Sequence, residues 1–199
     1  MASFLSVNLL ALFGVSLAAL TGLTTNASAS DTYCGKNPST WASDVAPELD
    51  GFYAVKNGAG VLSMAGRTMA LPAGNRSDAA IETAPNGSMK IMSSQIGGEF
   101  ELSFYKGAPW QIATSASSPL ADNEILTSSD LGVLINCDPN DLPRLQSKGR
   151  YRDPESGQDV DFTLYLFAVD PKTLYGVTVG RIQTPNGPGK AQRVLTLSR

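Results

Sequence analysis

The sequence contains no histidine. This absence excludes Ser-His-Asp and Cys-His catalysis, and it excludes metal sites built on imidazole ligands. The chain also lacks a Gly-x-Ser-x-Gly motif and the glycine-rich loops that bind phosphates. Charged residues make up only 17% of the chain and the net charge is −3, so the basic surface that nucleic-acid binding requires is missing. Binding functions and chemistry based on carboxylates are what these absences leave open.

A long, uninterrupted apolar run is missing too. The most apolar stretch covers residues 9–20, which is too short for a helix that spans a bilayer. Ala27-Ser28-Ala29 follows with the small residues of a cleavage site, although no Lys or Arg precedes the stretch. We therefore predict that residues 1–29 are a signal peptide that is removed, and that the protein is periplasmic or secreted with no transmembrane segment after cleavage.

Cysteine is scarce, with only Cys34 and Cys137 in the chain. In an exported protein an even number of cysteines predicts a disulfide, which here would close a loop of about 100 residues. Two unpaired buried thiols are the alternative. Because there is no Cys-x-x-Cys pair and no histidine, we predict no metal site and no cofactor.

What the chain does contain favours strands. Gly and Pro are frequent, at 19 and 12 residues, and they separate short alternating segments in the way that turns separate strands. We predict an all-β protein, an antiparallel meander of about eight to ten strands that closes into a barrel, since closure removes exposed edges. Residues 30–50 would form an N-terminal arm and residues 51–199 a single β-barrel domain.

The stretch 149–182 is predicted to form two successive hairpins. The turn at 153–157 contains Pro154 and Gly157, and it places Arg152 opposite Asp159 and Arg150 opposite Asp161. We expect these ion pairs to lie in solvent. Along residues 160–168 every second side chain is apolar, so this face should point into the core.

The register of residues 174–182 is open between two alternatives. A four-residue loop at 170–173 would place Val177, Val179 and Arg181 on the core face. A slip by one residue would instead place Gly176, Thr178, Gly180 and Ile182 there. The first register is preferred because the turn lacks a Gly for the bulge that the second requires.

These strands define a candidate ligand site inside the barrel. Residues 99–105 alternate strictly and direct three apolar side chains inward. Arg181 would lie at one mouth, where it could anchor a carboxylate or phosphate group. The predicted lining consists of Phe100, Leu102, Phe104, Phe162, Leu164, Leu166, Val177, Val179 and Arg181.

The segment from Pro47 to Tyr53 resembles the entry to a calycin or lipocalin-type barrel, where Gly-x-Trp opens the first strand. Tyr53 takes the position of that Trp. The resemblance implies that a basic residue on a late strand, Arg181 or Arg193, packs over the aromatic ring. The chain departs from lipocalins in lacking the Trp and in ending with a strand rather than a flanking helix. The resemblance implies a fold and carries no particular ligand.

We predict that the protein catalyses nothing and binds a small apolar or amphipathic molecule in the barrel. The first alternative is a secreted or periplasmic protein-interaction module, an inhibitor or envelope-assembly component, that uses the loop 106–130 with Trp110. A second alternative is a hydrolase that uses carboxylates such as Asp44, Glu48 and Asp50. An empty lumen would favour ligand binding, and a lumen filled by side chains would favour the interaction module.

Overall fold

The computed structural model describes residues 32–105, 135, 137–153, 157–185 and 187–199. The predicted signal peptide and the predicted interaction loop at 106–130 lie outside these residues. The disulfide, the barrel strands and the arm that precedes them lie within the described part of the chain.

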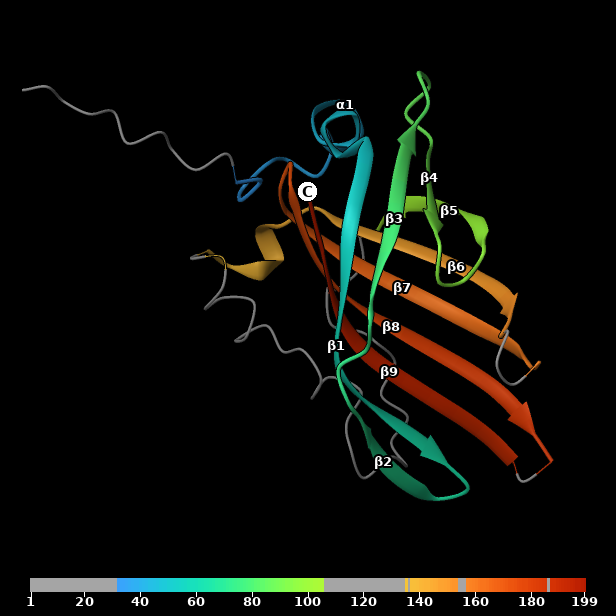
Figure 1. Cartoon of the computed structure of the whole chain (residues 1–199). Coiled ribbons are helices and arrows are strands. Elements are labelled where there is room, and N and C mark those ends of the chain that lie inside the picture. The colour runs from blue at the N-terminus through green and yellow to red at the C-terminus, as the bar shows by residue number, and fades with distance from the viewer. Residues whose placement is uncertain (1–31, 106–134, 136, 154–156, 186) are drawn as a thin grey trace, which may run out of the picture.

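Nine antiparallel strands form one sheet, and the pairing of its first strand with its last closes a barrel. β2 pairs only with the second half of β1, so eight strands make up the closed barrel and β2 extends beyond it (Figure 1). The all-β antiparallel meander that closes into a barrel is confirmed, and at a coarse level it is consistent with a calycin-like fold. The strands are β1 (Gly51–Met64), β2 (Arg67–Leu71), β3 (Arg76–Thr83), β4 (Met89–Ser93), β5 (Gly98–Phe104), β6 (Arg144–Arg152), β7 (Asp159–Asp170), β8 (Thr173–Thr184) and β9 (Gly187–Ser198).

β1 is longer than the sequence pattern suggests. Asn57-Gly58 reads as a hairpin turn, but the strand continues through it with a register shift against β9 between Asn57 and Gly60. A Cβ on Gly60 would lie 2.1 Å from the carbonyl oxygen of Gln192, so only glycine allows this close approach of the two backbones. The chain turns instead at Ala65-Gly66, where both residues have positive φ, 50° and 74°.

The arm closes one end of the barrel. It contains α1 (Trp41–Asp44) and the 3-10 helix η1 (Ala46–Leu49), and Figure 1 shows α1 beside the start of β1. Trp41, Val45 and Leu49 are fully buried in the same core cluster as the inward side chains of the barrel. The hydroxyl of Tyr53 on β1 donates a hydrogen bond to the carbonyl oxygen of Leu49 at 2.8 Å. The arm is therefore the apolar floor of the barrel.

The preferred register of β8 was wrong. The turn between β7 and β8 contains only Pro171 and Lys172, and a shift between Ala168 and Asp170 pairs Ala168 with Leu174. This irregularity forms without a glycine, because the side chain of Asp170 accepts a hydrogen bond from the backbone N–H of Lys172 at 2.7 Å and closes the turn. The face that points inward is therefore the alternative one, with Gly176, Thr178 and Gly180 opposite Leu166, Leu164 and Phe162.

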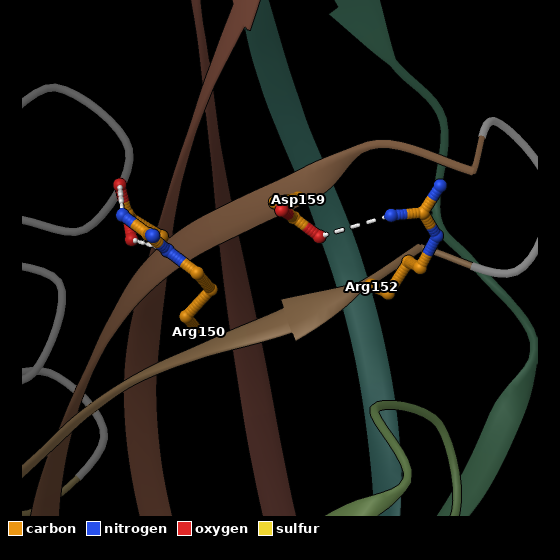
Figure 2. Close-up of polar contacts among 4 residues, drawn as sticks. Arg150, Arg152 and Asp159 are labelled. Carbon is orange, nitrogen blue, oxygen red and sulfur yellow. Dashed lines mark hydrogen bonds and ion pairs between the residues drawn. The ribbon is translucent and has the colours of Figure 1, made fainter.

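The predicted hairpin of β6 and β7 is confirmed. Arg150 pairs with Asp161 and Arg152 with Asp159, and Figure 2 shows the second pair facing across the hairpin. The guanidinium of Arg150 donates two hydrogen bonds, which hold the pKa of the Asp161 carboxyl below its usual range. All four side chains are largely exposed, so solvent screens both pairs.

The predicted disulfide between Cys34 and Cys137 is also confirmed, with Cα atoms 6.5 Å apart and a sequence separation of 103. It packs beside a second, smaller core cluster on the outer side of β7, together with Tyr175. The short 3-10 helix η2 (Pro139–Asp141) follows Cys137. The disulfide therefore joins the beginning of the arm to the chain segment that leads into β6.

Candidate functional site

The end of the barrel opposite the arm contains a cavity of about 470 Å³. Most of its lining is apolar and comes from strands on all sides of the barrel, and no residue of α1 or η1 reaches it. A cavity of this size is in the range of small-molecule sites. The principal apolar contributors are Val55, Ile91, Val160, Phe162, Leu164 and Leu195.

Glycines on the inward faces do not all create this space. A Cβ on Gly149 would meet the ring of Phe100 at 2.4 Å, and one on Gly176 would meet the side chain of Leu166 at 2.7 Å, so neighbours already fill those places. Gly180 lines the cavity, and a Cβ there would meet Val160 at 3.3 Å. The combination of Thr178 and Gly180, small residues on the inward face of β8, leaves the lumen open.

The predicted lining residues on β5 and β7 divide between the cavity and its floor. Phe162 and Leu164 line the cavity. Phe100 does not reach it but packs edge-on against Phe162, with ring centroids 4.8 Å apart. The rest are deeper: Leu102 and Leu166 are buried in the core, and Phe104 packs against Trp41.

The predicted lining residues on β8 lie on the other face of their strand. Val177 and Val179 are buried in a separate cluster with Tyr165 and Val194, outside the lumen. Arg181 is exposed and pairs in register with Asp161 on the charged outer face of β7. The prediction that these three residues lie inside the barrel was therefore wrong, because the shift between Ala168 and Asp170 turns their face of β8 outward.

Sequence reasoning missed the contribution of β1 and β9. Val55 and Asn57 on β1, and Arg193, Leu195 and Leu197 on β9, all line the cavity. The signal was present, because each set alternates with the period of two that marks one face of a strand. What was missing was the register between the first strand and the last, which brings these two faces together.

Arg193 is the one charged residue among the described residues that line the cavity. It is half-buried. A Cβ on Gly74 would lie only 2.2 Å from a terminal nitrogen of Arg193, so the guanidinium needs a glycine at position 74. Gly74 is itself held to β1, since its N–H donates to the carbonyl oxygen of Asn57 at 3.0 Å. Within the described chain Arg193 makes no hydrogen bond and no ion pair. The described residues thus offer this cation in the cavity wall no ionic partner.

Two polar side chains, Asn57 and Gln95, line the cavity together with Arg193. Asn57 is 5% exposed, and its amide donates to the carbonyl oxygen of Asn75 at 3.0 Å and to the side-chain oxygen of Gln95 at 3.2 Å. These bonds fix the Asn57 amide, so the polar side of the cavity is pre-organised.

Tyr151 adds a phenol ring to the cavity wall. Burial, reinforced by the negative charge of Asp153, raises the pKa of Tyr151 above its usual value. The phenol therefore stays neutral at physiological pH and adds no negative charge to the cavity wall.

The aromatic residue at the barrel entry has a basic partner other than the two expected. The guanidinium of Arg199 lies over the ring of Tyr53, 5.1 Å from its centroid, and donates a hydrogen bond to the carbonyl oxygen of Asp50. Arg181 is on the outer face and Arg193 is in the cavity, so neither packs there. The cation over Tyr53 thus belongs to the floor and ties the arm to the strands.

Neither the models of known protein families nor the curated proteins match this chain. Among the described residues, no helix combines the length and hydrophobicity that crossing a bilayer would require. Those same residues contain no group of three or more Cys, Asp or Glu side chains placed to share a metal ion.

Proposed function

We propose that the protein is a non-enzymatic binding protein that holds a small apolar or amphipathic molecule in the lumen of its barrel. The cavity of about 470 Å³ is the single observation that carries this proposal. The lining is mainly apolar with a few convergent polar groups, which is the usual composition of small-molecule sites. The relation to calycins, which the barrel architecture supports, belongs to the same proposal.

We also propose that the protein acts in an oxidising compartment outside the cytoplasm. The disulfide between Cys34 and Cys137 supports this, because such bonds persist mainly in oxidising environments. The signal-peptide pattern at residues 1–29 points the same way. An exported carrier or sensor of an amphipathic molecule would satisfy both features.

Filling the lumen should abolish binding. Leu164 projects into the cavity from the middle of β7, so Leu164→Trp would put an indole where a ligand would lie. We expect the affinity for N-phenyl-1-naphthylamine, a neutral apolar probe, to fall at least about tenfold, because the bulkier side chain removes lumen volume. Fluorescence titration of both proteins measures the effect.

Glu101→Trp is the matched control. Glu101 is exposed on β5, opposite Lys90, so the same indole would there be added to the outer face. This variant should bind the probe as wild type does. Equal binding by Leu164→Trp and wild type, with circular dichroism showing both folded, would rule out the lumen as the site; so would a wild type that binds no probe.

A further inference from the structure

From the position of Arg193 we infer that the ligand is an anionic amphiphile, with one carboxylate, phosphate or sulfate head group held by the guanidinium of Arg193 and an apolar body in the lumen. This inference deepens the proposed function and rests on it. Arg193 was not among the predicted lining residues, and in this inference it takes the anchoring role that the sequence suggested for Arg181.

The charge balance of the cavity favours an anionic ligand. Arg193 is positive, and none of the other lining residues is Asp or Glu. Its guanidinium has no ion-pair partner or hydrogen bond within the described residues. In the empty cavity water can solvate it. A ligand that displaced this water without offering an acceptor would leave a buried, unpaired cation, which is costly.

Small residues in the barrel wall make room for the guanidinium of Arg193. In the sheet, Arg193 pairs with Thr178 on β8 and with Gly60 on β1, so both of its cross-strand neighbours are small. Gly74 leaves the space that the terminal nitrogen occupies. Apolar lining residues flank Arg193 on the same face of β9, Ala191 on one side and Leu195 on the other.

The guanidinium of Arg193 also matches the geometry of an oxyanion. Arg presents a planar set of donors that fits carboxylate and phosphate oxygens in a bidentate manner. Asn57 and Gln95, which already bond to each other, lie on the same side of the cavity and extend the polar region. The lumen therefore has one cationic group with polar neighbours in an otherwise mainly apolar lining, which is the complement of a single-headed anionic amphiphile.

The test compares matched ten-carbon ligands as competitors of N-phenyl-1-naphthylamine. Wild type should bind decanoate and decyl phosphate at least about tenfold more tightly than decanol or decyltrimethylammonium, because a charged hydrogen bond replaces an unpaired cation. Acetate and inorganic phosphate should not displace the probe, since they lack the apolar body. Displacement by these small anions as effective as by the amphiphiles would identify a simple anion site and overturn the inference.

Substitution then assigns the preference to one residue. Arg193→Gln should bring the affinity for decanoate down to that for decanol while the neutral probe still binds. Arg193→Lys should retain part of the preference, because it keeps the charge but loses the planar pair of donors. Arg181→Gln is the matched control on the outer face and should behave as wild type.

The outcomes separate the two proposals. If wild type binds the neutral probe but prefers no anion, or if Arg193→Gln keeps the preference, the inference about the head group is wrong and lumen binding stands. If wild type binds neither probe nor amphiphile, the proposed function fails and the anchor fails with it. The comparison of ligands on wild type tests the head-group preference even if a variant does not fold.

Discussion

Trp41→Ala should lower the free energy of unfolding by about 3–5 kcal/mol, the usual cost of truncating a fully buried aromatic side chain. Trp41 is 1% exposed, and its indole N–H donates to the carbonyl oxygen of Lys36 at 2.9 Å. Its ring packs on Phe104 of β5 and beneath the guanidinium of Arg144 on β6. The substitution therefore removes the contact that fastens the floor to the barrel, and urea denaturation followed by circular dichroism measures the loss.

Phe52→Ala is the control for this prediction. Phe52 is an aromatic residue on β1 that is 83% exposed, so its truncation should change the unfolding free energy by no more than about 0.5 kcal/mol. If Trp41→Ala lowered the free energy of unfolding by less than about 1 kcal/mol, Trp41 would not fasten the arm to the barrel.

Replacing both cysteines should cost about 2–4 kcal/mol. The disulfide joins residues 103 positions apart, and a cross-link over so long a loop restricts the unfolded chain strongly. The double variant Cys34→Ala, Cys137→Ala removes the bond without leaving a free thiol. Its unfolding midpoint, measured beside that of wild type, gives the cost.

Reduction provides the matching check. Dithiothreitol should lower the midpoint of wild type towards that of the double variant, and it should leave the double variant unchanged. Peptide mapping of the non-reduced protein should recover Cys34 linked to Cys137. An unchanged wild-type midpoint after complete reduction would contradict a stabilising role for this bond.

Local signals were sufficient to predict the hairpin of β6 and β7. Pro154 and Gly157 mark its turn, and the register then follows by counting, which placed Arg152 opposite Asp159 correctly. The disulfide followed from the number of cysteines in the same direct way. These features depend on short stretches of chain or on a single possible pairing.

Two sequence cues for the register of β8 disagreed: Arg181 favoured the observed register, beside the charged face with Asp161, and the absence of a turn glycine favoured the other. Val177 and Val179 are each 1% exposed although they lie outside the lumen, so hydrophobicity does not distinguish the two faces. The shift after Ala168 then decides the outcome, and it needs no glycine. A rule based on glycine bulges favoured the wrong face, and the error placed Arg181, which lies on the outer face, inside the lumen.

The position of Arg193 in the cavity wall depends on long-range topology. Arg193 becomes part of a cavity only because β9 pairs with β1, which is distant in sequence, and because the glycines of β1 admit the close approach. Periodicity within β9 places Arg193 on the same face as Leu195 and Leu197, but only closure of the barrel makes that face an interior.

The most direct test of the central claim is a nuclear magnetic resonance experiment on the complex with decanoate. Intermolecular nuclear Overhauser effects should connect the acyl chain to the methyl groups of Val55, Leu164 and Leu195, which line the lumen. Val177 and Val179, equally buried but outside it, should give none. Contacts to these two outer valines, or saturation with decanoate that leaves the lumen methyl groups unperturbed, would contradict a ligand site inside the barrel.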